Sequence, residues 1–463
     1  MKNAFRAIVS FLCICLVTAA LLSVVSNAVS RKDSWIKNAE FFEEKNQHDI
    51  LFFGSSHMLN AVFPMELWSE YGYTSYNFAG HGSRVPTNYW IMRNALQYSK
   101  PKVVVIDCYY LSSDDKTDTK SEFLHLSLDA FPVSKTKIEA VYDLFGSTKD
   151  RAAFLFPFVT YHNRWKELTA ADFVPNISTE KGGSIRLGAI SLEQQAYLAP
   201  EEMCTDNALG VSYLRKMIEY CQESGIEVVL TYIPYATAAW GQRESNKAVA
   251  LAQEYGISCL DLRTLDKQIN YVTDFSDNGH LNYSGGMKVT QYIGSYIKEN
   301  FDVADRRADP DYQGWFEDQM RYTAYKAELL QQQKSAALTL PLLADQAWTT
   351  VMLVNGQWNF SAADMMLLDW GVAPEVLDSD RTFLLYRDRA NGICQTVFAG
   401  ESLKTSQGDL VLTEENGVLG VYLAGEPVFT MAHNEDVGMW YWVLNANSGE
   451  SVYQTAFNKK GYR

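Results

Sequence analysis

Residues 49–57 read DILFFGSSH, and the predicted architecture follows from this stretch. Its apolar run, stopped by Gly54, predicts a buried strand followed by a sharp turn. Such a strand places Ser56 at the carboxyl edge of a parallel sheet, where open α/β folds bind their ligands. Further strand-like runs, alternating with helix-like segments, lie at residues 74–78, 102–107, 227–233 and 257–262. This alternation predicts an α/β fold with a doubly wound parallel sheet.

A second stretch, DFSDNGHLN at residues 274–282, supplies groups that would make a serine reactive. A nucleophilic serine needs a base, and the base needs an acid that holds its tautomer. Asp277 and His280 lie three residues apart, so the carboxyl group can orient the imidazole; Asp274 is a less well spaced rival. Gly82 follows the second strand, where a backbone amide could approach an oxyanion without obstruction.

Length and composition exclude several classes of protein. The chain has 463 residues, enough for two or three domains, and 47% hydrophobic residues, enough for a sizeable core. Its net charge of −15, without a basic run, argues against nucleic acid as a partner. The seven cysteines and seven histidines are scattered, so we expect neither a disulfide framework nor a metal site.

The first 30 residues form a separate segment. An apolar run from Ala7 to about Val25 follows two basic residues. Roughly 19 residues at about 1.5 Å each span most of a hydrocarbon core, whereas signal peptides have a shorter apolar region of about 7–15 residues. This length favours an uncleaved single-pass anchor, although Ser-Asn-Ala at 26–28 would serve as a cleavage site and give a secreted protein. In either case the remaining chain is expected on the extracytoplasmic side.

The remaining sequence divides by pattern. We expect a membrane anchor at 1–30, an α/β domain at 31–305, a linker helix at 306–340 and a β-rich domain at 341–463. A short helix over 35–47 should precede the first strand. Between about 112 and 200 the alternation breaks, which predicts an inserted helical subdomain or lid. Short strands of the tail are predicted at 351–358, 382–386, 410–412, 418–423, 427–431 and 439–444.

From about residue 49 to 300 the chain resembles the SGNH/GDSL hydrolase superfamily. Residues 54–57, GSSH, match its nucleophile block, with Ser56 as the nucleophile. Residues 77–82, NFAGHG, match the block that supplies an oxyanion glycine, here Gly82, and the Ser56 amide would be a further donor. Asp277 and His280 match its Asp-x-x-His block as orienting acid and general base. The resemblance implies a flavodoxin-like fold and serine ester chemistry, which requires no cofactor.

The third block of the family departs from the pattern. Where the family usually has Gly-x-Asn-Asp, residues 106–111 read IDCYYL, without an asparagine. Losing one oxyanion donor costs about 2.7–4 kcal/mol of transition-state stabilisation. Either another group substitutes, or the enzyme is slow toward water, or it is inactive. The missing block, the anchor and the insertion resemble the DltD-type and alginate-acetylation-type branches, extracytoplasmic proteins that work with membrane-bound O-acyltransferases on cell-envelope polymers.

Five further residues are candidates for substrate contact, namely His57, His81, His162, Arg164 and Tyr232. The two histidines His57 and His81 flank the predicted site, and His57 either caps the next helix, packs or touches substrate. The pair at 162 and 164 belongs to an aromatic-rich part of the insertion, which either packs as a cap or contacts an anionic or sugar-bearing substrate. Tyr232 ends a strand beside Pro234 and either lines the pocket or packs in the core.

These patterns leave two functions open. The first is a membrane-anchored serine esterase or O-acyltransferase that adds or removes an acyl group, such as acetyl, on a cell-envelope or extracellular polysaccharide. The second is a catalytically weak scaffold that binds envelope glycan or partners a membrane-bound O-acyltransferase.

Overall fold

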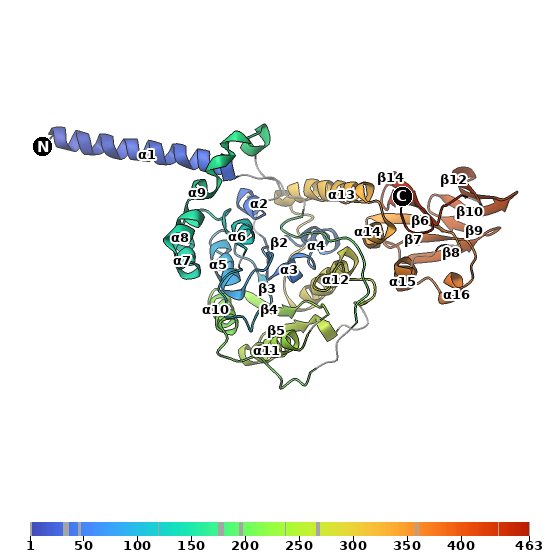
Figure 1. Ribbon diagram of the computed structural model, residues 1–463, viewed down its shortest axis with the longest axis horizontal. Coiled ribbons are helices and arrows are strands. Elements are labelled where there is room, and N and C mark those ends of the chain that lie inside the picture. Colours follow the sequence, from blue (N-terminus) through green and yellow to red (C-terminus); the bar gives the residue numbers. More distant parts are fainter. Residues whose placement is uncertain are drawn as a thin grey trace.

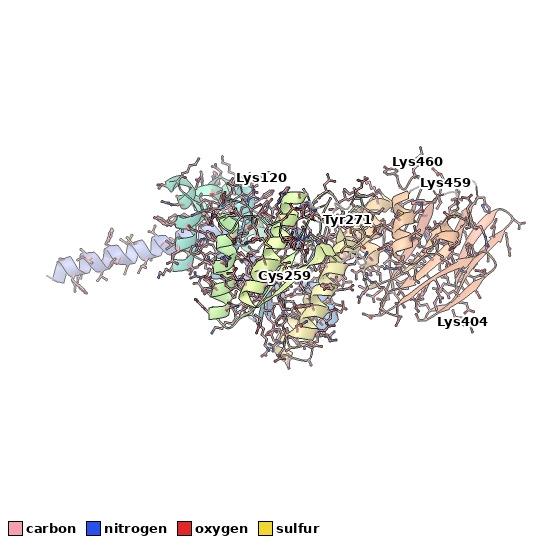
Figure 2. All side chains as sticks on the ribbon, turned by 90° about the horizontal axis from the view of Figure 1, so that it is seen from below. Lys120, Cys259, Tyr271, Lys404, Lys459 and Lys460 are labelled. Carbon is pink, nitrogen blue, oxygen red and sulfur yellow. The ribbon has the colours of Figure 1, made fainter. Side chains whose placement is uncertain are left out.

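The computed structural model describes residues 2–30, 37–44, 48–118, 120–174, 180–193, 198–236, 238–264, 269–356, 358, 361–433 and 435–462. Its first helix, α1 (Lys2–Ser30), projects from the packed side chains of the remainder in two perpendicular views (Figure 1, Figure 2). The segment Ala4–Ser30 is long and apolar enough to cross a membrane, a character that a signal sequence shares. The helix expected over 35–47 is observed as α2 (Ala39–Glu43), and positions 35, 36 and 45–47 lie outside the described residues.

A five-stranded parallel sheet confirms the predicted α/β class. Its strands are β1 (Ile50–Phe53), β2 (Ser75–Asn77), β3 (Val103–Asp107), β4 (Glu227–Tyr232) and β5 (Ser258–Asp261). Their order is β2-β1-β3-β4-β5, an order used by doubly wound folds. The apolar strands β1 and β3 are buried along their whole length, as strands covered by helices on both faces require.

Helices cover the two faces of this sheet. In Figure 1, α5 and α10 lie on one side, and α4 and α12 lie on the other. The helices of this domain are α3 (Ser56–Leu59), α4 (Pro64–Tyr71), α5 (Val85–Ala95), α10 (Leu209–Glu223), α11 (Ala239–Tyr255), η4 (Leu262–Thr264) and α12 (Tyr283–Asn300). Since the order reverses between β1 and β3, the binding crevice expected of such a fold lies at the carboxyl ends of these two strands.

The region predicted as a helical insertion is helical only in its first part. It contains α6 (Ser121–Leu128), α7 (Lys135–Leu144), α8 (Thr148–Leu155), α9 (Pro157–Tyr161), η2 (His162–Lys166) and η3 (Ala170–Phe173). Residues 180–193 instead run as extended chain beside β2, where the Asn77 amide donates to the Lys181 carbonyl at 3.0 Å. Gly182 has a φ of +82°, and a Cβ there would lie 2.2 Å from the Asn77 carbonyl oxygen, so this close approach requires glycine.

The tail is β-rich, as predicted, with more strands than the sequence indicated. One antiparallel sheet has the order β14-β13-β6-β7-β8 and the other β12-β11-β10-β9. The strands are β6 (Trp348–Val354), β7 (Phe383–Asp388), β8 (Ile393–Phe398), β9 (Ser402–Thr405), β10 (Gly408–Glu415), β11 (Val418–Leu423), β12 (Glu426–Ala432), β13 (Met439–Asn445) and β14 (Ser451–Phe457). The strands β8, β9 and β14 lie outside the predicted ranges, and most of their residues are exposed or half-buried.

The two domains are joined through α13 (Gly314–Gln332), which lies between them in Figure 1. It is flanked by η5 (Pro310–Tyr312) before it and by α14 (Ala336–Thr339) and η6 (Leu340–Ala344) after it. The tail also contains α15 (Ser361–Asp369) and α16 (Pro374–Leu377). The domain division, with a linker helix over 306–340, stays a prediction; α13 lies within that range.

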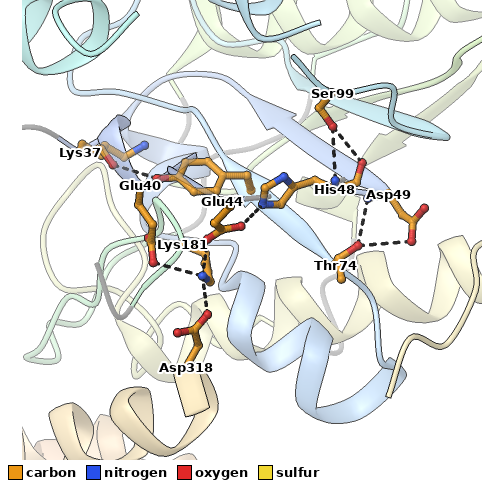
Figure 3. Close-up of polar contacts among 10 residues, drawn as sticks. Lys37, Glu40, Glu44, His48, Asp49, Thr74, Ser99, Lys181 and Asp318 are labelled. Carbon is orange, nitrogen blue, oxygen red and sulfur yellow. Dashed lines mark hydrogen bonds and ion pairs between the residues drawn. The ribbon is translucent and has the colours of Figure 1, made fainter. Parts of the chain in front are cut away.

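Two buried ammonium groups fix α13 to its neighbours. Lys181 Nζ contacts Glu44, lies 3.1 Å from Glu40 Oε1 and lies 2.6 Å from Asp318 Oδ2 on α13 (Figure 3). The three carboxylates lie close enough together to resemble a cation site, but the ammonium of Lys181 stands among them.

The second ammonium, Lys326 Nζ, lies 2.7 Å from Glu66 Oε1 and contacts Asp345, which precedes β6. The Tyr283 hydroxyl lies 2.8 Å from an oxygen of each carboxylate. Because this Lys326 cluster is fully buried, it ties α4, α12, α13 and the β-rich tail into one structure.

Candidate active site

Ser56 follows β1 as the first residue of the short helix α3. The Ser55 side chain caps this helix, accepting a hydrogen bond from the His57 amide at 3.3 Å. Gly54 allows β1 to end tightly against β3, because a Cβ there would lie 2.7 Å from Asp107 Cβ and 2.9 Å from Met58 Cβ. The sequence therefore places the Ser56 hydroxyl at the crevice between β1 and β3.

His280 lies directly against this hydroxyl. Its Nε2 is 2.8 Å from Ser56 Oγ, and its Nδ1 is 2.8 Å from Asp277 Oδ1. Asp277 Oδ1 also accepts hydrogen bonds from the Gly279 and His280 amides, both at 2.9 Å. These amide bonds explain the three-residue spacing, because the turn itself orients the carboxylate toward the imidazole. The structure thus brings Ser56, His280 and Asp277 into one hydrogen-bonded chain.

The protonation states suit proton transfer from the serine. Burial, followed by the positive charge of Arg186, lowers the pKa of His280 below its ordinary value, so the imidazole is neutral at pH 7. Burial acts to raise the pKa of Asp277, but the Gly279 amide and the His280 side chain outweigh it and hold that pKa low. A neutral imidazole beside an ionised carboxylate can accept a proton from Ser56 Oγ.

Asp274, the rival acid, has a different role. Its carboxylate is fully buried and lies 2.8 Å from Lys288 Nζ on α12. It also accepts a hydrogen bond from the Asn270 amide at 2.7 Å. Asp274 therefore stabilises the loop before α12, and the group that contacts His280 is Asp277.

Arg186 is a site residue that the sequence did not indicate. It lies on the extended segment 180–193, and its Nη1 is 2.6 Å from Asp277 Oδ2. The Arg186 carbonyl accepts a hydrogen bond from the Tyr283 amide at 2.8 Å, which fixes this segment beside α12. A lone arginine in the stretch SIRLG carries no motif, so only the fold reveals that it reaches Asp277.

The predicted oxyanion donors lie on loops at one edge of the sheet. These loops are joined by the Gly80 amide, which donates to the Gly54 carbonyl at 3.1 Å. Within the described part of the chain, neither the Ser56 amide nor the Gly82 amide donates to another group. Gly82 has a φ of +59°, and a Cβ there would lie 2.0 Å from Asp118 Oδ2. The positive φ and the close approach of Asp118 both require glycine at this position. The Asp118 carboxylate thus lies beside a predicted oxyanion donor.

In place of the missing third block, β3 ends in a buried acid, Asp107. Asp107 Oδ1 accepts from the Ile233 amide at 3.2 Å, and Asp107 Oδ2 accepts from Ser55 Oγ at 3.4 Å. Burial raises the pKa of Asp107 to about 7. This acid therefore supports the residue before Ser56 rather than contacting the His280 imidazole.

His57 packs among aromatic rings beside the site. Its ring centroid lies 3.9 Å from that of Tyr109, 4.7 Å from that of Tyr235 and 5.6 Å from that of His280. Burial, followed by the charge of His280, lowers the pKa of His57 to about 3, so this imidazole is neutral. Trp240 extends the aromatic surface, 5.5 Å from Tyr109 and 43% exposed.

His81 lies close enough to Arg186 and His280 for their charges to act on it. Its ring packs 5.1 Å from Phe123, and burial, followed by the charge of Arg186, lowers its pKa to about 4. Of the predicted contact residues, His57 and His81 are thus the two that the structure brings near His280.

The other three predicted contact residues do not reach the site. Arg164 binds Asp172 and the Val29 carbonyl, and His162 Nδ1 lies 3.0 Å from the Val159 carbonyl, so both belong to the surroundings of α1. Tyr232 is fully buried, with its hydroxyl 3.4 Å from Glu244 and 3.5 Å from the Tyr235 hydroxyl. It lies in the core beneath Tyr235 instead of lining a pocket.

Comparisons with known proteins add little to this geometry. No family model and no curated protein matches the chain. One solved structure, described as a "putative acylhydrolase" from Bacteroides fragilis, is similar over 58% of this chain and 99% of its own, with 14% identity and a TM-score of 0.29. At that score the likeness carries no argument about activity.

Proposed function

We propose that this protein is an SGNH-type serine enzyme that hydrolyses or transfers an acyl ester. The observation that supports this most strongly is the 2.8 Å contact between Ser56 Oγ and His280 Nε2, with Asp277 on the other imidazole nitrogen. A nucleophile, a base and an orienting acid in this geometry recur in serine hydrolases of unrelated folds. The groups that this ester chemistry needs are side chains and backbone amides of the protein.

The mechanism follows from the positions of these groups. As Ser56 Oγ bonds to the acyl carbon, its proton passes to His280 Nε2, and Asp277 stabilises the resulting imidazolium. The carbonyl oxygen, now negative, is held by the amides of Ser56 and Gly82. His280 then gives its proton to the leaving alkoxide, and the acyl group remains on Ser56. Water or a glycan hydroxyl then attacks the acyl carbon while His280 takes its proton. The bond between the acyl carbon and Ser56 Oγ breaks as His280 returns that proton to Oγ, which releases the acid or the new ester and restores the free serine.

We propose that the substrate is an acylated cell-envelope or extracellular polysaccharide. The enzyme would act on it from an anchored, extracytoplasmic position. Two features support this proposal. The apolar helix α1 has the length of a membrane span, and the exposed Trp240 offers a flat apolar surface, beside Tyr109 and His57, against which a sugar ring could pack.

A scaffold role is the second candidate, because of the oxyanion side of the site. The third block lacks its asparagine, and the Asp118 carboxylate lies where it would repel an oxyanion at Gly82. In this role the protein would bind envelope glycan or a membrane-bound O-acyltransferase without turning over an ester itself.

Labelling with a serine-directed fluorophosphonate separates the two candidates. The full chain in detergent is treated with the reagent and weighed by intact-mass spectrometry. We expect one adduct on the wild type and none on Ser56→Ala or His280→Ala. Ser212→Ala is the matched control, since Ser212 on α10 only donates to the Leu209 carbonyl, and should label fully. No adduct on folded wild type would overturn the enzyme proposal and leave the scaffold.

A further inference from the structure

The insertion exposes an unusual number of large apolar side chains within one short segment. We define the aromatic patch as Phe156, Phe158, Val159, Trp165 and Phe173, whose exposed fractions range from 37% to 64%. None of the residues of α9 and η2, which carry most of the patch, is buried. Several large apolar side chains exposed within one short segment indicate a site that contacts a protein or a membrane.

The position of the aromatic patch indicates which of these it contacts. The elements α9, η2 and η3 all contact α1. The Phe158 amide donates to Ser26 Oγ at 3.1 Å, and Arg164 Nη1 donates to the Val29 carbonyl at 2.5 Å. Figure 1 shows α9 beside that end of α1 which joins the rest of the molecule. Val29 is fully buried here, whereas the large apolar residues of α1 up to Val25 are exposed.

The level of these contacts along α1 matches the surface of a bilayer. The apolar run of α1 ends at about Val25. At about 1.5 Å per residue, a run of roughly 19 residues crosses the hydrocarbon core. Ser26 and Val29 then lie about 1.5–6 Å beyond it, within the headgroup layer. Tryptophan is enriched at that depth because its ring is amphipathic, and Trp165 with the neighbouring Lys166 ammonium, 5.6 Å from its ring, fits this environment.

We infer that the aromatic patch inserts into the lipid headgroup layer of the membrane that α1 crosses. The patch is thus a second membrane contact, beside the anchor, and it sets the orientation of the α/β domain on the bilayer. This inference rests on the proposed membrane anchoring by α1 but not on the chemistry of Ser56. The alternative is that a protein partner covers the patch. Vesicles that contain only this protein lack such a partner, so insertion of the patch there cannot be due to one.

Photolabelling from the lipid phase tests the inference. The full-length chain is reconstituted into phosphatidylcholine vesicles that contain a phospholipid with a diazirine on its acyl chain. After irradiation, labelled peptides are mapped by mass spectrometry. The diazirine is placed at the glycerol end of the acyl chain, so that it reports the boundary between headgroups and hydrocarbon. The test variant is Phe156→Asn/Trp165→Asn/Phe173→Asn. The control variant, Val133→Asn/Met320→Asn/Val418→Asn, replaces apolar residues of 63%, 66% and 42% exposure elsewhere on the surface.

We expect label on α1 and on peptides from 156–174 in the wild type and in the control variant. The test variant should lose most of the label on 156–174 and keep the label on α1. Label on α1 without label on 156–174 in the wild type would overturn the inference while leaving the anchor intact. Absence of label from α1 as well would instead remove the anchoring proposal on which the inference rests.

Discussion

Two places in the molecule pair carboxylates with a cation, and burial gives them different roles. In the Arg186–Asp277 pair the side chains are 35% and 44% exposed, whereas Lys326, Glu66 and Asp345 are 0%, 7% and 1% exposed. An exposed pair is screened and adds about 0–1 kcal/mol to stability, so its main effect is on the His280 it faces. A buried pair cannot lose one partner without leaving an uncompensated charge. The same residue types therefore adjust reactivity in one place and join domains in the other.

The largest effect should be on activity, and it should come from removing the reactive groups beside the Arg186–Asp277 pair. Under the proposed mechanism, Ser56→Ala or His280→Ala should lower ester hydrolysis by about 10³–10⁶-fold, because the members of such a set act together. The measurement is kcat/KM with p-nitrophenyl acetate, with the melting temperature recorded in parallel. Retention of activity in Ser56→Ala, with a wild-type melting temperature, would contradict the assignment.

A change in the buried Lys326 cluster should lower the stability of the fold. Lys326→Met should lower the free energy of unfolding by about 3–5 kcal/mol, because Glu66 and Asp345 would remain charged in the interior without their cation. Urea unfolding followed by far-UV circular dichroism measures this loss. Lys334→Met is the control, since Lys334 is exposed just beyond α13 and its replacement should leave stability nearly unchanged.

A compensated variant sharpens this prediction. In Glu66→Gln/Lys326→Met/Asp345→Asn no formal charge remains in the cluster, so much of the stability lost in the single variant should return. If the triple variant is as unstable as Lys326→Met, the uncompensated charge is not the cause of the loss.

Arg186→Met should change pH dependence more than stability. Arg186 lowers the pKa of His280, so its removal raises that pKa and keeps the imidazole protonated, and inactive as a base, to higher pH. The acid limb of the kcat/KM profile should therefore move to higher pH. Activity at pH 7 should fall roughly tenfold, the scale of about 1.5 kcal/mol for a lost hydrogen bond to a charged group. Arg307→Met, which breaks an exposed pair with Asp305, should leave the profile unchanged.

The smallest effect concerns the carboxylate beside Gly82. If the Gly82 amide binds the oxyanion, Asp118→Asn should raise kcat roughly threefold, or about 0.6 kcal/mol, as expected for removal of a screened charge. Asparagine keeps the oxygen that accepts from the Lys120 amide at 2.7 Å, so the loop is preserved. A kcat that falls instead would show that the Asp118 charge supports the reaction.

Most of the α/β fold could be predicted because its signals are local. The buried strands β1 and β3 are continuous apolar runs, and both are observed where the sequence predicts them. The extended course of residues 180–193 could not be predicted, because it depends on long-range contacts such as Lys181 with Asp318. Strand β9, with the sequence SLKT, was missed because it contains no apolar run.

The candidate site divides in the same way. Ser56, Asp277 and His280 could be singled out because a strand end and a three-residue spacing are visible in the sequence. Arg186 and Asp118 could not, because each reaches the site from a distant part of the insertion and belongs to no motif. For His162 and Arg164 the aromatic-rich surroundings left cap packing and substrate contact both open; Arg164 contacts the Val29 carbonyl of α1, and His162 contacts the Val159 carbonyl.

The Lys326 cluster also restricts how this protein could be rearranged in evolution. Its carboxylates belong to different halves of the chain, Glu66 to the α/β domain and Asp345 to the β-rich tail, and they share a single lysine. A recombination event that moved the tail onto another enzyme would separate these carboxylates from Lys326 or from each other. Each would then be buried without its present partners. The tail is therefore not an exchangeable module, and changes on either side of the junction have to be inherited together.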